Sequence, residues 1–440
     1  MSSSRARVFS PRYARYALGV LFTINLFNYM DRQIISGVLP LVQADLALSD
    51  AALGALASAF MFLYLLGSVP LGVLGDRVAR HRLIAVGVGV WGAATFLSGL
   101  AQSYGQLFLT RALVGIGEAS YGPTATAMVS DLFPKARRGL VNGLFNAAIP
   151  LGGAIGVIVG GVVGSHFGWR PAFFLVGVPS LALAALAWRL GDPPRGGQDV
   201  TVADGPIAPA ARATSLPKLV TGIRRLFRTP TFVMVCAVGM LVAFAIGALN
   251  HWLPLYLHRV KRFSVAEASF WFGALSACGG LTGVVAGGVI GDALTRRTPA
   301  GHLLTIAGGF ILSAPFGLLL LLNQNRLVFL PALFFAVFFL VLYAGSVNAV
   351  IHNVVHPSLR ATAVAIFVFV INLGGAALSP AIVGLISDRR QSLQAAMLLL
   401  PIMVFFAGLI ALAAASVVGG DMQRVERSLA PTGSEPSIHG

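Results

Sequence analysis

The chain of 440 residues is 57% hydrophobic and only 10% charged, whereas a soluble domain carries about 25% charged residues. This composition excludes a soluble globular fold, because such a surface cannot mostly face water. In a soluble protein the formal net charge of +16 would indicate nucleic-acid binding. Here its uneven distribution between loops indicates membrane topology instead, and we expect no nucleic-acid partner.

Twelve apolar runs follow one another along the chain, most of them at or above the ~20 residues that cross a ~30 Å hydrocarbon core as a helix. Barrel strands would instead be segments of about 10 residues with alternating hydrophobicity. We therefore predict an all-α integral membrane protein in the bilayer. Its transmembrane helices are expected at residues 16–42, 51–76, 83–102, 106–133, 138–165, 169–189, 231–257, 265–291, 302–322, 327–354, 361–386 and 393–415.

A polar, proline-rich stretch at residues 191–230 interrupts the apolar runs and leaves six predicted spans on either side. In its last part, LPKLVTGIRRLFRTP, apolar residues recur on one helical face, which predicts a short amphipathic helix on the membrane surface. The expected organisation is a tail (1–15), a six-helix bundle (16–190), the linker (191–230), a second six-helix bundle (231–415) and a second tail (416–440).

Basic residues lie mainly on one side of the predicted topology. With twelve spans both termini lie on the same side, and the loops there hold 22 of the 31 Lys and Arg residues, against 7 in the opposite loops. This asymmetry predicts that both termini and the linker are cytoplasmic. Only three of the basic residues are lysine and no Asn-x-Ser/Thr site occurs, which favours a multi-pass protein of a bacterial inner membrane.

The two halves resemble each other in sequence. GVLGDRVARHR (72–82) follows the second span and GVIGDALTRR (288–297) follows the eighth, so that Asp76 corresponds to Asp292 and Arg80 to Arg296. FPKARRGL and HPSLRATA form a second matching pair, and IPLGG and INLGG a third. Three matches in the same order indicate an internal duplication, as in transporters built from repeats.

Glycine recurs at every fourth residue in the fifth and eighth spans. Such stripes let a neighbouring backbone approach closely. They are explained either by static helix packing or by the two stripes facing each other across the halves, where a smooth surface would help the halves to rock. The residues concerned are Gly152, Gly156, Gly160 and Gly164 in one span and Gly279, Gly283, Gly287 and Gly291 in the other.

Charged residues occur deep in the first and fourth spans. Asp31 and Arg32 are neighbours and point about 100° apart, so they need separate partners. Arg111 and Glu118, spaced i, i+7, share one face of the fourth span, and counting residues from the cytoplasmic ends places Asp31 and Glu118 at the same depth.

Charge inside the membrane costs from ~2.5 kcal/mol upward and is usually functional. We predict that Asp31 and Glu118 form a proton switch. Arg32 and Arg111 are then their charge partners or bind an anionic substrate headgroup. The alternative is a static ion-pair network.

The second half has almost no charge inside its spans. We expect Asn348 and Asn372 to line a cavity, together with Asn28 and Tyr29 of the first span. His251 and His352 lie toward the ends of their spans and are expected at the membrane interfaces. One charged half and one apolar half predict an amphipathic substrate.

Twelve spans in two halves, with GxLGDRxxR after the second span, resemble the major facilitator superfamily, and NYMDRQIISGVLP in the first span resembles its spinster branch. The resemblance implies rocker-switch transport coupled to protons, with a lysolipid or sphingoid lipid phosphate as substrate. It also implies a cytoplasmic gate formed by Asp76, Arg77 and Arg80. The second copy, with Asp292 and Arg296, is expected to be weaker because Ala293 replaces its first arginine.

A functional monomer with no cofactor other than the coupling proton, and with no metal, is expected. There are two alternative functions. A proton-coupled carrier of a soluble organic anion or drug-like compound stays open, because the arginines would also suit a carboxylate. A membrane-embedded enzyme is disfavoured, because the chain has neither a GxxxxGK[ST] phosphate loop nor a His-Glu-x-x-His zinc motif. The sequence leaves the direction of transport open.

Overall fold

The computed structural model describes residues 9–75, 77–195 and 216–429, and the described part of the chain is helical with no strand. Ten helical segments of this part are long and apolar enough to cross a membrane, judged by length and composition. The other two predicted spans correspond to α1 (Pro11–Leu46) and to α4 (Tyr104–Ala119) with α5 (Gly122–Leu132). These segments carry the internal charges, which account for the difference.

The N-terminal bundle holds the first six predicted spans. Its first helix is capped by the Ser10 side chain, which accepts a hydrogen bond from the Tyr13 amide. The fourth span is divided at Ser120 and Tyr121. Its helices are α1 (Pro11–Leu46), α2 (Asp50–Gly75), α3 (Arg80–Gly99), α4 (Tyr104–Ala119), α5 (Gly122–Leu132), α6 (Lys135–Phe167) and α7 (Trp169–Trp188).

The C-terminal bundle follows the linker helix α8 (Leu216–Phe227). Its tenth span is divided at Val341 and Leu342, which matches the break in the fourth span of the first half. The segments are α9 (Pro230–Arg259), α10 (Val265–Thr295), α11 (Gly301–Leu322), α12 (Arg326–Leu340), α13 (Tyr343–Val354), η1 (Pro357–Leu359), α14 (Arg360–Val370), the π-helical η2 (Ile371–Ala376), α15 (Ser379–Arg390), α16 (Leu393–Met397) and α17 (Leu399–Leu429).

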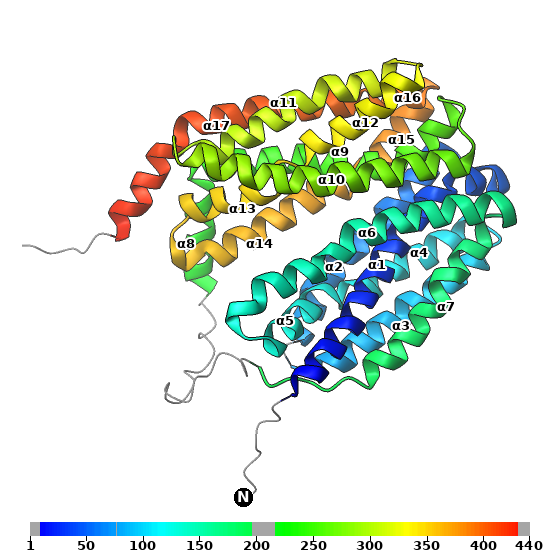
Figure 1. The fold of residues 1–440 in the computed structure, drawn as a ribbon, viewed down its shortest axis with the longest axis horizontal. Coiled ribbons are helices and arrows are strands. Elements are labelled where there is room, and N and C mark those ends of the chain that lie inside the picture. Colours follow the sequence, from blue (N-terminus) through cyan, green and yellow to red (C-terminus); the bar gives the residue numbers. More distant parts are fainter. Residues whose placement is uncertain (1–8, 76, 196–215, 430–440) are drawn as a thin grey trace, which may run out of the picture.

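The two bundles meet at one end and diverge toward the end that holds the first residues of α1 (Figure 1). Across the interface α6 packs on α10, α2 on α15 and α1 on α9. At the meeting end, a Cβ added to Gly54 would lie 2.6 Å from the carbonyl carbon of Pro380 in the other bundle. Toward the other end of α6, a Cβ added to Gly139 or Gly143 would meet no described atom outside its own helix within 4 Å. We call these the closed end and the open end.

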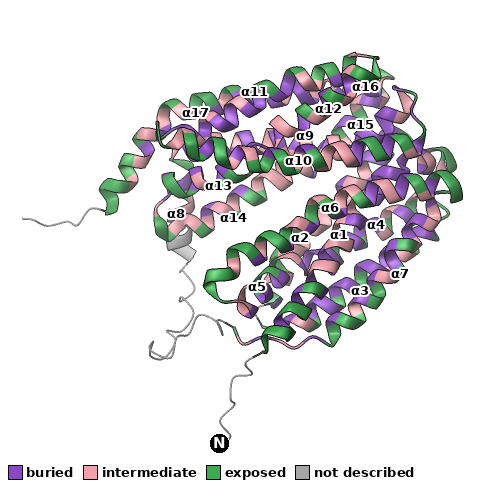
Figure 2. Ribbon diagram, viewed as in Figure 1, coloured by how far each residue is buried: buried purple, intermediate pink, exposed green. Residues whose placement is uncertain are grey.

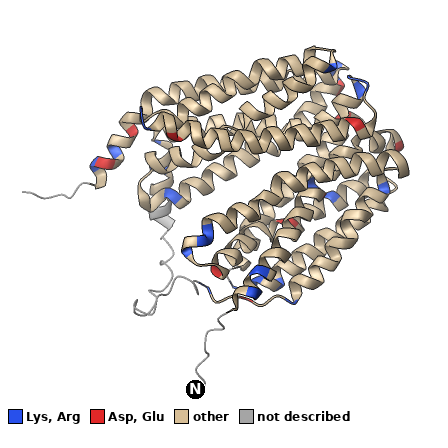
Figure 3. Cartoon of the chain, in the orientation of Figure 1, with Lys and Arg blue, Asp and Glu red and all other residues tan. Residues whose placement is uncertain are grey.

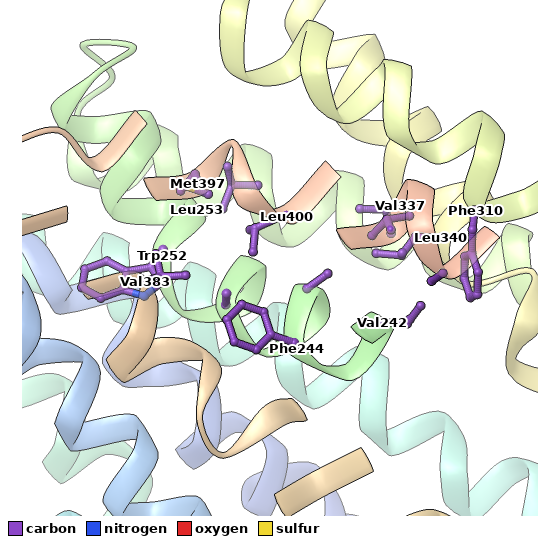
Figure 4. Packing of buried hydrophobic residues seen from close by; sticks show 14 of the residues in the cluster. Val242, Phe244, Trp252, Leu253, Phe310, Val337, Leu340, Val383, Met397 and Leu400 are labelled. Carbon is purple, nitrogen blue, oxygen red and sulfur yellow. The ribbon is translucent and has the colours of Figure 1, made fainter. Parts of the chain in front are cut away.

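Residues on the helix faces that point into each bundle are mainly buried, and residues on the outer faces are mainly exposed (Figure 2). The larger buried cluster fills the C-terminal bundle and continues across the interface to residues of the N-terminal bundle such as Ile34 of α1 and Leu53 of α2. Within the C-terminal bundle, Trp252 of α9 lies beside Val383 of α15 (Figure 4). The Trp252 indole donates a hydrogen bond to the Pro380 carbonyl, 3.1 Å away. Large apolar side chains such as Val285 and Val289 of α10 are exposed, as expected for helices that face lipid.

The glycine stripes pack inside each bundle, so the expectation that they face each other across the halves is wrong. A Cβ on Gly156 would lie 2.7 Å from Met30 Cα of α1, and Gly152 and Gly160 face the same helix. Gly279, Gly283, Gly287 and Gly291 likewise face neighbours within the C-terminal bundle, the first three of them on α12 and the residues just after it. The stripes allow α6 to pack on α1 and α10 on α12.

Other residues of the same two helices make the contact between the halves. Gly161 of α6 lies directly against Ser269 of α10, and Gly273 of α10 lies against Ile158 of α6. The Ser269 hydroxyl donates to the Gly37 carbonyl of α1 at 3.3 Å. These residues are one helical position or more away from the stripes, so they point toward the opposite bundle.

Candidate functional site

Asp31 of α1 forms a fully buried ion pair with Arg111 of α4. The Arg111 Nη1 atom lies 2.8 Å from Asp31 Oδ1, and its Nη2 atom donates to the Asp31 carbonyl at 3.2 Å. The Thr95 hydroxyl of α3 donates to the other carboxylate oxygen, Oδ2. Both oxygens of Asp31 therefore have a donor.

Arg32, one residue after Asp31 on α1, pairs with Glu118, seven residues after Arg111 on α4. The Arg32 Nε atom lies 2.6 Å from Glu118 Oε2, and the Glu118 side chain has no solvent exposure. The second carboxylate oxygen, Oε1, is buried and has no hydrogen-bond partner among the described residues. The four charges thus form two separate pairs and sum to zero, and both pairs join α1 to α4.

The Arg32 guanidinium is held in place by aromatic rings as well as by Glu118. It lies 4.7 Å from the ring centroid of Tyr64, 5.0 Å from that of Tyr29 and 5.4 Å from that of Phe60. Such cation–π contacts orient a guanidinium without neutralising it. The side chain keeps an exposed fraction of 18%, against 3% for Arg111.

A cavity of about 330 Å³ lies between the two bundles beside these pairs. Arg32 and Arg111 line it, whereas Asp31 and Glu118 do not. The arginines therefore stand between the carboxylates and the cavity. We call it the polar cavity, because its walls also carry Tyr29, Gln33, Ser36, Asn250, His251, Tyr343 and Asn372.

A second cavity of about 300 Å³ adjoins the first and shares Tyr29, Gln33 and Asn250 with it. We call it the apolar cavity, because its remaining lining is mainly hydrophobic and comes from α6, α9, α10 and α12 with the residue after it. The residues include Ile149, Val157, Leu249, Phe272, Val337, Leu340 and Val341. At the interface between the bundles, the polar cavity with its two arginines is thus continuous with the apolar cavity.

The predicted cavity residues divide into two groups. Tyr29 and Asn372 line the polar cavity. Asn28 is buried but lines neither cavity, and Asn348 is exposed on α13. Asn28 and Tyr29 are consecutive residues of α1, so their side chains point in different directions. Only the packing of α1 decides which of the two side chains faces the cavity.

Sequence reasoning misplaced His251 and missed Gln33 and Ser36. His251 is buried in the wall of the polar cavity rather than interfacial, and no residue that the structure describes forms a hydrogen bond with its Nε2 atom. The reason is that α9 continues two turns beyond His251, to Arg259, so the residue lies deeper than its place in the apolar run suggested. Gln33 and Ser36 share the face of α1 that carries Tyr29 and Arg32, a spacing that the sequence already contained.

The repeated motif after the second span lies at the open end. Asp76 is outside the described residues, and Arg77 is exposed. Arg80 forms an ion pair with Asp131 of α5, inside its own bundle. In the second copy, Asp292 and Arg296 are exposed, and neither forms an ion pair with a described residue. In this arrangement neither copy bridges the two bundles through the described residues.

At the closed end, charged groups do join the bundles. Arg259 of α9 donates to both carboxylate oxygens of Asp50 on α2, each at 2.8 Å. The Ser387 hydroxyl donates to Asp50 Oδ2 at 2.6 Å, and Gln43 bonds to both Asp50 and Arg259. Asp388 accepts hydrogen bonds from the first amides of α2. We call Gln43, Asp50, Arg259, Ser387 and Asp388 the closed-end cluster.

Charged residues of the C-terminal bundle lie near its ends, while the N-terminal bundle also carries charge in its interior (Figure 3). Two helical bundles with a charged cavity between them are the arrangement expected of a membrane transporter built from repeats. The family model of the Major Facilitator Superfamily matches residues 21–380. The chain belongs to this superfamily, and its relatives place it in the spinster branch.

The relatives include Protein spinster of Drosophila melanogaster, 33% identical over 384 residues that cover 85% of this chain and 62% of the fly protein. The chain is 30% identical to the "Sphingosine-1-phosphate transporter SPNS2" of Danio rerio, over 96% of this chain and 88% of that protein. The fold is similar to a crystal structure of a bacterial homologue of human spinster in an inward-facing, unoccupied conformation. The TM-score is 0.77 at 24% identity, covering 97% of this chain and all of the other.

These comparisons confirm the predicted superfamily, its spinster-like character and the all-α membrane fold. The chain is a multi-pass membrane transporter and not an enzyme, because its named relatives are transporters with the same fold.

Proposed function

We propose that this protein is a proton-coupled secondary transporter of an amphipathic, lipid-like substrate with a phosphate headgroup, such as a lysolipid or a sphingoid lipid phosphate. The observation that carries the proposal is that two arginines, each paired with a buried carboxylate, line a cavity continuous with an apolar one. The arginine guanidinium forms bidentate hydrogen bonds with both phosphate and carboxylate groups, so a substrate phosphate can take the place of a carboxylate.

Arg32 is the better placed of the two for this exchange. It is the more exposed arginine and its aromatic neighbours keep it at the cavity wall. A phosphate that binds Arg32 competes with Glu118 for its positive charge. Glu118 then loses its partner inside the membrane, and a buried carboxylate without a partner becomes neutral by taking a proton. Substrate and proton are linked in this way through one arginine.

Of the two carboxylates in the proposed switch, geometry favours Glu118 as the group that titrates. Its Oε1 atom is free to accept a proton, whereas both oxygens of Asp31 already have donors. Asp31 and Arg111 then hold α1 against α4 while the other pair exchanges.

The apolar cavity suits the hydrocarbon part of the substrate. Its walls of Phe272, Val337 and Leu340 offer no charge, and it meets the polar cavity at Tyr29 and Asn250. A molecule with its phosphate at Arg32 would extend its chain toward α10 and α12. The name of the zebrafish relative, a sphingosine-1-phosphate transporter, supports this class of substrate.

Transport would proceed by rocker-switch alternating access of the two bundles. With both termini and the linker in the cytoplasm of a bacterial cell, the open end faces inward and the closed-end cluster seals the outer side. Return to the outward-open form requires the cluster to break and the gate motif with Asp76, Arg77 and Arg80 to engage the other bundle, with Asp292 and Arg296 as the weaker counterpart. The monomer contains every part of this mechanism, and the coupling ion is the only cofactor proposed.

The test is uptake of a labelled lysophospholipid into proteoliposomes with and without an imposed pH gradient. We expect gradient-dependent uptake, lost in Arg32→Gln and reduced about tenfold in Arg32→Lys, because lysine keeps the charge but not the planar, two-pronged donor. Uptake that ignores the gradient would contradict proton coupling. Saturable uptake of a small organic acid, untouched by lysolipid, would instead favour the soluble-anion carrier.

A further inference from the structure

A separate cavity of about 160 Å³ lies in the C-terminal bundle where the linker helix joins it. Its walls come from the end of α8, the residues before α9, the segment between α13 and α14, and the last turns of α17. It lies at the open end, outside the interface between the bundles, and it shares no lining residue with the polar or the apolar cavity.

Three arginines line this cavity: Arg225, Arg228 and Arg424. Arg424 is paired with Asp421 at 2.9 Å. Asp421 is itself buried, and its other oxygen accepts from the Thr231 amide at the start of α9 at 2.9 Å. The aspartate is therefore held by groups of its own bundle, through an ion pair at Oδ1 and a hydrogen bond at Oδ2, while Oδ1 accepts no hydrogen bond from a described residue.

Arg225 and Arg228 have no such partner among the described residues, and neither forms an ion pair there. They are spaced i, i+3 and so lie on the same side of the α8 end. The side chain of Leu226 between them is buried against the bundle. This apolar contact holds the α8 end in place, so the two guanidinium groups are brought to the cavity by the packing of α8.

The chemistry around the two arginines suits one kind of ligand. Thr229 and His356 add polar groups to the lining, and the net charge of the four ionised side chains is +2, from three arginines and one aspartate. Two exposed arginines that line a small polar space favour an oxyanion with several acceptor oxygens. α8 is amphipathic, and such helices lie at the membrane surface among the phosphates of anionic lipids.

We propose that this cavity binds the phosphate group of an anionic ligand between Arg225, Arg228 and Arg424, and that the bound phosphate fastens the linker helix to the C-terminal bundle. The source is either the headgroup of an anionic lipid or a soluble phosphate. The proposal does not depend on the transported substrate, because the site is outside the transport cavity.

The experiment measures the unfolding temperature of the full-length protein in neutral detergent during titration with phosphatidylglycerol. Phosphatidylcholine serves as the neutral lipid, and sodium phosphate is titrated separately against sodium chloride at matched ionic strength. The variant is Arg225→Gln/Arg228→Gln. The matched control is Arg224→Gln/Arg297→Gln, which removes the same charge from exposed arginines, one on α8 and one just after α10, that do not line the cavity.

We expect phosphatidylglycerol to raise the unfolding temperature of the unmodified protein and of the control at the same concentration. The half-saturating concentration should rise about fivefold for each cavity arginine lost, hence about 25-fold in the variant. If sodium phosphate alone gives the same stabilisation, the ligand is a soluble phosphate; if only the lipid does, it is a headgroup.

Equal responses of variant and control to both probes would overturn the site, as would equal stabilisation by phosphatidylcholine. If the glutamine variant does not fold, Arg225→Lys/Arg228→Lys keeps the charge and removes the two-pronged donors. It should bind the same probe more weakly than the unmodified protein, and an unchanged half-saturating concentration would again overturn the proposal.

Discussion

Asp388, near the end of α15, accepts a hydrogen bond from the backbone amide of Asp50, the first residue of α2, at 3.0 Å, and a second from the next amide at 2.9 Å. A carboxylate from one bundle thus satisfies free amides at the start of a helix in the other bundle, where the helix dipole favours negative charge. The gate motif is expected to make the same kind of contact at the opposite end. In the proposed alternating-access cycle, the contact at the closed end and the gate contact at the open end would form in turn and not at the same time.

The first prediction concerns this contact. Asp388→Ala removes two charge-assisted hydrogen bonds, each worth about 1.5–3 kcal/mol, so the closed end should open in more than tenfold more molecules. Spin labels at Gln102 and Gln324, exposed loop residues of the two bundles, report the separation by their distance distribution. Cys236 and Cys278 are replaced beforehand, because both are free thiols.

Asp45→Ala is the matched control for Asp388→Ala. Asp45 lies toward the same end and pairs with Arg170 at 2.8 Å, but both residues belong to the N-terminal bundle. Its loss should leave the distance distribution unchanged. A distribution that shifts equally in both variants would mean that Asp388 has no particular part in holding the bundles together.

The second prediction separates the two buried pairs by function. Glu118→Gln keeps an oxygen to accept the Arg32 hydrogen bond but cannot exchange a proton. Accumulation driven by a pH gradient should therefore be lost, while exchange of substrate at equal pH on both sides persists. Both are measured in proteoliposomes with labelled lysophospholipid. Gradient-driven accumulation that survives Glu118→Gln would remove this residue from the proton path.

The third prediction compares how much the protein is destabilised when each of the two buried ion pairs is broken. Both arginines line the polar cavity, but Asp31→Asn leaves Arg111 without a carboxylate partner at 3% exposure, whereas Glu118→Gln leaves Arg32 at 18% exposure. Breaking a buried pair on one side costs about 3–5 kcal/mol. Asp31→Asn should therefore lower the unfolding temperature in detergent clearly more than Glu118→Gln does. Equal losses would show that exposure of the arginine to the cavity makes no difference.

The fourth prediction tests the packing of α6 with three alanine substitutions on one helix. Gly156→Ala places a Cβ 2.7 Å from Met30 Cα and should destabilise the N-terminal bundle by about 1–3 kcal/mol. Gly161→Ala meets Ser269 and a backbone carbonyl of the other bundle, so it should open the closed end instead. Gly153→Ala, whose nearest neighbour is Gln33 Cγ at 3.7 Å, should change neither property.

Unfolding temperature and the spin-label distance at the closed end are measured for each glycine variant. If Gly161→Ala lowers stability without changing the distance, the residue belongs to the static packing of its own bundle. If Gly156→Ala changes the distance, the stripe takes part in the contact between the halves after all.

The positions of the helices follow from the sequence, because a chain inside hydrocarbon must satisfy its backbone hydrogen bonds within each segment. An apolar run of sufficient length is then a helix, whatever surrounds it. The same reasoning identified the charged residues of the first and fourth spans, since ionised groups in a membrane need partners. The i, i+7 spacing of Arg111 and Glu118 also shows that both face one way.

The sequence by itself therefore determined the helical spans, their division into two similar halves and the four charges that need one another. Only the tertiary structure decided how the charges pair, that the arginines and not the carboxylates line the cavity, and that His251 belongs to it. It also turned the glycine stripes inward and joined Asp50 to Arg259 and Asp388. These features depend on the rotation of each helix about its axis and on contacts between segments from 80 to 338 residues apart. Such contacts leave no periodic pattern in the chain, because they are made by single residues from separate helices.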